Sequence, residues 1–194
     1  GERSMAEIMK TWKKFQTALF FNCALNNATP QDWARIGKST ILDIALNANI
    51  TTNDFIEDEN PTDNIDNYKP SIAEELVMMR GDKGYDAIYN IYYNMPTGGE
   101  AMRDVLVVYP AVQKAADEAA TAAYFAWQTL ATIVITDYDA VAEKIKFNVN
   151  FAGDIIRGSA ASVDGAPVFT PFADQAVWID TADATSAPDT PEMP

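Results

Sequence analysis

One segment of the chain alternates strictly between polar and apolar residues. From Lys144 to Phe151 the sequence is Lys-Ile-Lys-Phe-Asn-Val-Asn-Phe, so every second residue is apolar. Successive side chains of a β-strand point to opposite faces of a sheet, and this alternation is the pattern of a strand with one buried face. The segment therefore predicts a β-sheet that packs one of its faces on a hydrophobic core.

Other short segments, separated by turn-forming residues, also have the composition of strands. Ile41–Ile50 alternates in a similar way and predicts a second half-buried strand. The remaining expected strands are residues 18–21, 33–37, 71–79, 105–110, 126–136, 155–160 and 167–170. Asp164-Gly165, a pair typical of hairpin turns, joins the last two. About eight or more strands with one helix predict a mainly β (α+β) fold, a β-sandwich or small β-barrel with a flanking α-helix.

That single helix is expected at residues 84–94. The residues spaced at i, i+3, i+4 and i+7 are Tyr85, Ile88, Tyr89 and Tyr92. This spacing places them on one helical face, which is more often a core-packing face than a platform for a ligand. Asp82 is the expected N-cap, and Met-Pro-Thr-Gly-Gly at residues 95–99 is the expected stop.

The length of 194 residues suits one domain. Residues 1–16 are predicted to form an N-terminal arm and residues 17–172 the β domain. Residues 173–194, acidic and rich in Ala, Thr and Pro, predict a flexible C-terminal tail. Within the domain, residues 51–67 are rich in Asp, Glu, Asn and Thr and predict a long exposed loop or a protruding hairpin. The alanine-rich residues 111–123 favour a helix or a structured loop.

Histidine is absent, and cysteine occurs once, at Cys23. This composition excludes Ser-His-Asp and Cys-His catalysis, His-containing zinc sites and a disulfide within the chain. The glycine pairs lack the spacing of a phosphate-binding loop, so we predict a non-enzymatic protein without a cofactor. Cys23 lies in an apolar segment and is expected to be a small buried residue.

No apolar segment is long enough for a transmembrane helix, and residues 5–16 are charged where a secretory signal would be apolar. We therefore expect synthesis in a cytoplasm and no membrane partner. The 28 acidic residues outnumber the 14 basic ones, for a formal net charge of −14. This charge opposes nonspecific attraction to nucleic acid and to anionic membranes.

The carboxylates gathered between residues 54 and 66 are the strongest candidate for a metal site. Such oxygen ligands can bind calcium or magnesium, but the spacing matches no EF-hand loop and lacks its central glycine. A solvated loop is therefore favoured. A pair of carboxylates at a suitable separation could also hydrolyse glycosides.

Several segments follow one another in a defined order: Trp33–Thr40, Asp54–Thr62, Tyr68–Ser71, Lys83–Tyr89, Phe147–Asp154, Arg157-Gly158 and Val168–Thr170. Together, over roughly residues 17–172, they resemble the major tail tube proteins of long-tailed (siphovirus-type) bacteriophages. The alanine-rich segment and the acidic tail depart from that family's pattern.

The resemblance implies a β-sandwich or barrel with a flanking helix. It also implies a structural virion protein that self-assembles in the host cytoplasm into stacked hexameric rings, forming the tail tube through which DNA passes. The implied partners are further copies of the chain and the tape measure, terminator and baseplate proteins. DNA would cross the lumen without specific binding, and we expect more carboxylates than amines to line that lumen, because each cation would hold phosphate.

Open strand edges are expected to pair between copies, and the 51–67 segment is expected to contact neighbouring subunits. Its candidate contact residues are Asp54, Phe55, Ile56, Glu57, Asp58, Glu59, Asp63 and Asp66. Two alternatives stay open. One is a tail terminator, a baseplate component or a secretion-system tube on the same fold. The other is a carbohydrate- or peptide-binding β-sandwich that uses Trp12, Trp33, Trp127 or Trp178.

Overall fold

The computed structural model describes residues 17–24, 28–57, 59–113, 123–163, 166–175 and 184–186. The protein is mainly β with one α-helix, as predicted, and its strands pair antiparallel. Among the described strands the sheet order does not close into a barrel, so the barrel alternative is wrong. The chain divides into two compact units, one built mainly from residues 21–104 and 129–154, the other from residues 105–128 and those after 154.

The unit built from residues 21–104 and 129–154 contains a sheet in the order β8-β9-β6-β3. Its strands are β3 (Ser39–Ala45), β6 (Ser71–Val77), the second half of β8 (Ala123–Asp139) and β9 (Lys144–Phe151). The alternation predicted for β9 is confirmed, because Ile145, Phe147 and Val149 are at most 1% exposed. Ile72 and Leu76 of β6 lie across from Val149 and Ile145 and are fully buried beside them.

The helix α1 (Lys83–Asn94) begins and ends as predicted. Asp82 caps it by accepting a hydrogen bond from the Tyr85 N–H at 2.9 Å, and Met95 ends it in the left-handed conformation at φ 45°. A short 3-10 turn, η4 (Gly98–Ala101), follows. Gly84 allows α1 to approach the residues around β2 (Trp33–Arg35), since a Cβ there would lie 3.1 Å from the Arg35 carbonyl oxygen.

The predicted core-facing residues of α1 are buried only in part: Ile88 is fully buried, whereas Tyr85 and Tyr92 are half-buried. The buried residues of the helix are Gly84, Ile88 and Ile91, which share a neighbouring face. Tyr89 is 39% exposed and Tyr93 is 70% exposed. The tyrosines instead contact one another and Tyr138 of β8, whose ring is 4.6 Å from that of Tyr92 and nearly parallel to it. Helical spacing identifies which residues share a face of the helix, but it does not identify which face packs against the core. In α1 the core-packing face is the one that carries Gly84, Ile88 and Ile91.

The other unit contains the first half of β8, flanked by β7 and β10. Its other strands are β1 (Ala18–Asn22), β7 (Met102–Gln113), β10 (Ile156–Val163), β11 (Ala166–Pro171) and β12 (Ala184–Ser186). Residues 105–108 are completely buried. The expected hairpin is present, because β10 and β11 pair from Val163↔Ala166 to Gly158↔Pro171.

The structure also bears on the predictions for the alanine-rich segment, the C-terminal tail and the N-terminal arm. β7 extends to residue 113, so the start of the alanine-rich segment is strand, while residues 114–122 lie outside the described residues. Within the predicted tail, the short strand β12 pairs with β7. The rest of the tail after residue 175, and the predicted arm at residues 1–16, lie outside the described residues.

Candidate assembly hairpin

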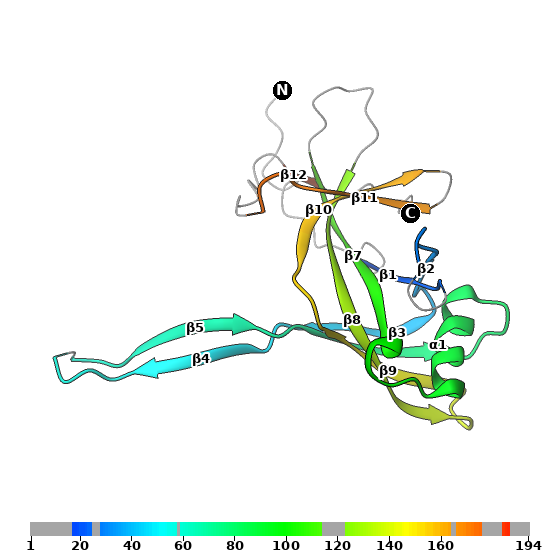
Figure 1. Cartoon of the computed structure of the whole chain (residues 1–194), viewed down its shortest axis with the longest axis horizontal. Coiled ribbons are helices and arrows are strands. Elements are labelled where there is room, and N and C mark those ends of the chain that lie inside the picture. The colour runs from blue at the N-terminus through cyan, green and yellow to red at the C-terminus, as the bar shows by residue number, and fades with distance from the viewer. Residues whose placement is uncertain are drawn as a thin grey trace, which may run out of the picture. The chain divides into compact units, whose positions relative to one another are not determined.

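Residues 48–68 form a two-stranded hairpin of β4 (Ala48–Asn53) and β5 (Thr62–Tyr68). Of the two alternatives for the 51–67 segment, the structure therefore has the protruding hairpin. It continues the β3–β6 ladder, which ends at the pair Ala45↔Ser71, and it begins at Ala48↔Tyr68. Figure 1 shows it extending away from β3 and β6. At about 3.4 Å per residue, its six-residue strand β4 spans about 20 Å.

The junction with the sheet is held by Asn47. Its φ of 49° is left-handed, a conformation that asparagine tolerates better than most residues. The Asn47 side-chain amide donates to the Lys69 carbonyl oxygen at 3.0 Å and to the Ser71 hydroxyl at 3.1 Å. The single strand predicted for Ile41–Ile50 is therefore wrong, because the chain turns at Asn47 between β3 and β4.

The hairpin has one apolar and one polar face. The register pairs Ala48 with Tyr68 and Ile50 with Ile65 on one face. Ile50, Ile65 and Tyr68 are 53–54% exposed. The other face pairs Asn49 with Asn67, Thr51 with Asn64 and Asn53 with Thr62. The arm therefore presents an uncovered apolar stripe over the part nearer the sheet, up to the polar pair Thr52 and Asp63 on the same face.

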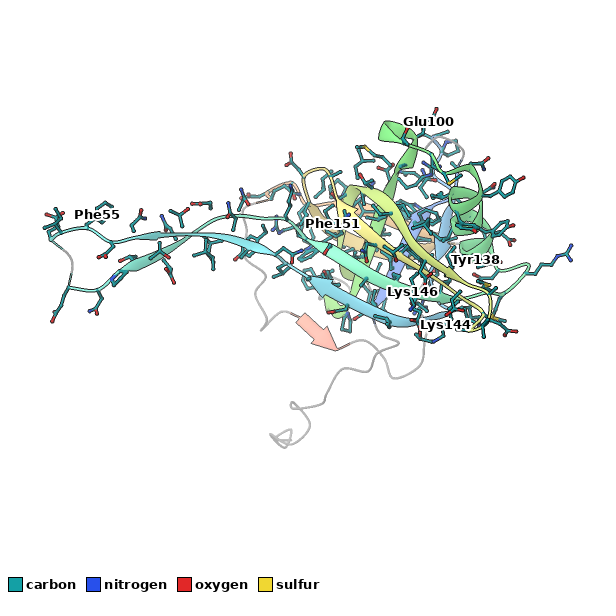
Figure 2. The ribbon with its side chains drawn as sticks, turned by 90° about the horizontal axis from the view of Figure 1, so that it is seen from below. Phe55, Glu100, Tyr138, Lys144, Lys146 and Phe151 are labelled. Carbon is teal, nitrogen blue, oxygen red and sulfur yellow. The ribbon has the colours of Figure 1, made fainter. Side chains whose placement is uncertain are left out.

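The hairpin tip adds two further apolar side chains. Phe55 is 57% exposed and Ile56 is fully exposed, and Figure 2 shows Phe55 at the far end of the hairpin. The acidic candidates of the tip are Asp54, Glu57 and Glu59, all exposed. Asp58 lies outside the described residues.

The two remaining candidates, Asp63 and Asp66, lie on β5 and stabilise the hairpin. The Thr52 hydroxyl donates to Asp63 Oδ1 at 2.6 Å, and the Thr51 hydroxyl donates to Asp66 Oδ2. Asp66 is the extra residue of a bulge, since the register shifts between Asn49 and Ile50. No group of three acidic, Cys or His side chains that could hold a metal ion occurs among the described residues.

Sequence reasoning missed the contribution of Ile50, Ile65 and Tyr68 to this surface. The sequence patterns place Ile50 in a half-buried strand and Ile65 in the exposed loop or hairpin of residues 51–67, and they predict no element at Tyr68. The signal was present in the sequence, because Ile65 and Tyr68 are apolar residues within a polar segment.

The strand that leads into the hairpin is also exposed. β3 is the last strand in the order β8-β9-β6-β3, so one of its edges has no partner strand in the described part of the chain. Ile41 is 44% exposed and Leu42 is 36% exposed. Unpaired strand edges readily accept another strand.

The polar face of this sheet carries a small ion-pair network. Glu75 pairs with Lys144, and Lys146 lies 3.7 Å from Glu75 and 3.9 Å from Asp137. The hydrogen bond from Lys144 holds the pKa of Glu75 below its ordinary value. The register also places Asp43 and Asp139 on this face, so it bears four carboxylates, Asp43, Glu75, Asp137 and Asp139, and two amines, Lys144 and Lys146.

The opposite face of the sheet holds an unusual carboxyl group, that of Glu74. Its side chain lies between Leu42 of β3 and Phe147 of β9 in register and is 3% exposed. Neither oxygen forms a hydrogen bond within the described residues. Burial raises the pKa of Glu74 to about 8, although the nearby Ser39 hydroxyl opposes the change.

The remaining candidate residues are the cysteine and the four tryptophans. Cys23 is half-buried, not fully buried as expected, and burial raises its thiol pKa to about 11, so the thiol is protonated at neutral pH. Trp127 packs edge-on against Tyr109, with 5.1 Å between ring centroids, and Trp33 is half-buried. Trp12 and Trp178 lie outside the described residues. No helix in the described segments has the length and apolar character needed to cross a bilayer.

No family model matches the chain, and no curated protein is significantly similar in sequence. A chain in the six-fold symmetrised cryo-EM structure of the anti-feeding prophage (AFP) baseplate is similar in structure. It is 11% identical, the alignment covers 77% of this chain and 96% of that chain, and the TM-score is 0.42. A similarity of this degree carries no argument about function.

Proposed function

We propose that this chain is a structural subunit of a phage tail or a related injection machine, and that its copies form rings that stack into a tube for DNA. The observation that carries the proposal is the β4–β5 hairpin, an arm with an uncovered apolar stripe. The ordered segments that resemble tail tube proteins support the same assignment.

An isolated two-stranded hairpin is marginally stable in water. This one exposes Ile50, Ile65 and Tyr68 side by side and adds Phe55 and Ile56 at its tip. Each such side chain contributes about 1.5–3 kcal/mol when it is fully transferred from water to an apolar contact. Docking of the stripe on a neighbouring copy would therefore stabilise both the arm and the assembly.

The open edge of β3 supplies a second contact. A strand edge of the next copy can extend the β8-β9-β6-β3 sheet, and repetition of that contact by rotation closes a ring. In this arrangement the polar face of the sheet lines the lumen. Its four carboxylates outnumber its two amines, which suits a conduit that must not hold the phosphates of passing DNA.

The apolar stripe can be tested against the polar face of the same hairpin. The double variant Ile50→Ser/Ile65→Ser is expected to keep the melting temperature of the monomer, because both side chains are about half exposed, and to lose assembly. The matched control, Asn49→Ser/Asn64→Ser, changes two residues on the opposite face and is expected to assemble. Negative-stain microscopy and analytical ultracentrifugation measure the result.

Microscopy also separates the alternatives. Open-ended tubes support the tube assignment, whereas single rings support a terminator. Absence of any assembly from concentrated wild-type protein, or normal assembly by Ile50→Ser/Ile65→Ser, contradicts the proposed use of the hairpin.

A further inference from the structure

Glu74 is a buried carboxyl group whose oxygens accept no hydrogen bond within the described residues, and it lies beside the edge strand β3. It lies on the core face of β6 with Ile72 and Leu76 on the same strand. A carboxylate in such surroundings has no hydrogen bonds to replace those it makes with water, and this is unfavourable unless the group is neutral. The ionised form therefore favours any movement that returns it to solvent.

The strand most easily moved is β3. It pairs with β6 alone in the described sheet, whereas β6 and β9 each have two neighbours. Four consecutive β3 residues, Thr40–Asp43, are exposed, so β3 is less covered than β6 or β9. Leu42 lies directly across from Glu74, and a β-bulge interrupts the ladder between Ser39 and Leu42. Withdrawal of β3 would therefore expose Glu74 to water.

The charged groups around Glu74 do not compensate its charge. From β9 the neighbour in register is Phe147, while Lys144 and Lys146 lie on the opposite face with Glu75. From β3 the neighbours are Leu42 and the hydroxyl of Ser39, which bonds to the backbone of Ile41 and Glu75. Because no cationic side chain of β3 or β9 lies next to Glu74 in register, its negative charge is removed by protonation.

We propose that the protonation state of Glu74 controls whether β3 stays on the sheet and so whether the assembly hairpin is held in place. β4 continues from β3 through Asn47, so release of β3 frees one of the two strands on which the arm is mounted. The effect on assembly rests on the proposed function. The movement of β3 does not, because it takes place within a single chain.

The direction of the pH dependence follows from the pKa of Glu74, which burial raises from 4.5 to about 8. The closed form retains the proton up to about pH 8, whereas the open, solvated form loses it above 4.5. The equilibrium constant for closure is therefore largest below pH 4.5, falls by about tenfold per pH unit up to about pH 8, and changes no further above it. Mildly acidic solution favours the closed strand and the fixed arm.

Hydrogen–deuterium exchange of the full chain at pH 5.5 and 7.5, corrected for the intrinsic exchange rate, tests the movement. The protection of the β3 amides relative to those of β9 is expected to fall by about a hundredfold between these pH values. In Glu74→Gln the fall should disappear. Asp43→Asn, which removes one negative charge from an exposed position on β3 itself, should behave as wild type.

An unchanged β3 protection in the wild type, or the same loss in Glu74→Gln, overturns the proposal. Sedimentation at the same two pH values then addresses assembly: wild-type assemblies should weaken at pH 7.5 and those of Glu74→Gln should not. If the chain assembles at neither pH, the proposed function fails while the exchange result still decides the role of Glu74.

Discussion

At the residue scale, Gly158 shows how one missing side chain permits a strand pair. A Cβ at this position would lie 2.3 Å from the Thr170 carbonyl oxygen and 2.6 Å from the Phe169 ring. Both neighbours belong to β11, which pairs with the β10 strand that contains Gly158. Any residue larger than glycine must therefore displace backbone as well as a ring.

We expect Gly158→Ala to lower the free energy of unfolding by about 1–3 kcal/mol, because the methyl group forces a backbone shift in a packed strand pair. Thermal and urea unfolding measure the change. Gly99→Ala is the control, since a Cβ at Gly99 meets nothing within 4 Å. Equal stability of the two variants would mean that β11 is free to move away from β10.

At the element scale, the hairpin is attached to the sheet by a closed junction. The Lys69 N–H donates to the Leu46 carbonyl oxygen at 3.1 Å, so the chain is already paired where the hairpin begins. A two-residue turn can therefore replace residues 48–68 without opening the β3–β6 ladder. The hairpin can be removed as one piece.

The variant in which a Gly-Ser or Asn-Gly turn replaces residues 48–68 is expected to fold with a melting temperature within a few degrees of wild type. The residues removed are almost all exposed, so little core is lost. It should remain monomeric at concentrations where wild type assembles, as measured by ultracentrifugation. Loss of cooperative unfolding would show that the arm contributes to the fold, and normal assembly would contradict its proposed contact.

At the scale of the whole molecule, the chain has a formal net charge of −14, and the polar face of the β8-β9-β6-β3 sheet also carries more carboxylates than amines. Acidic protein surfaces repel DNA at a range set by the salt concentration. The two amines of this face are paired with Glu75, which limits their attraction for phosphate. Both lysines of this face therefore lie beside a carboxylate, which suits the proposed lining.

We expect no measurable binding of duplex DNA by fluorescence anisotropy at about 50 mM salt, where phosphate contacts are strong. The variant Asp43→Lys/Asp137→Lys reverses two charges on the sheet face and should acquire salt-dependent binding. Charge reversal at Asp54 and Glu57 of the hairpin tip is the matched control and should change binding less. Tight, salt-sensitive binding by the wild-type chain would contradict a non-gripping lining.

Much of the fold was predictable from local patterns. Strict alternation located β9 and its buried face, because a period of two is compatible with only one arrangement of a half-buried strand. Asp82 and the residues after Asn94 located both ends of α1, because capping depends on neighbouring residues alone. The mainly β class with a flanking helix followed from these elements.

Other features depended on contacts between distant residues, which no local pattern contains. The break at Asn47 is held by hydrogen bonds to Lys69 and Ser71, more than 20 residues away. The inward turn of Ile88 rather than Tyr89 depends on what α1 packs against. The candidate hairpin was located by composition, but its apolar stripe required the register of β4 and β5.

The sequence by itself thus determined a β-rich fold with one helix, an acidic surface and a polar segment that had to be exposed. These properties depend on periodicity, capping and charge, which are local or additive. Only the tertiary structure decided that this segment is an arm with exposed apolar residues on one face and that Glu74 is buried beside an edge strand. Both depend on which strands pair, and in which register, and pairing brings together residues far apart in the chain.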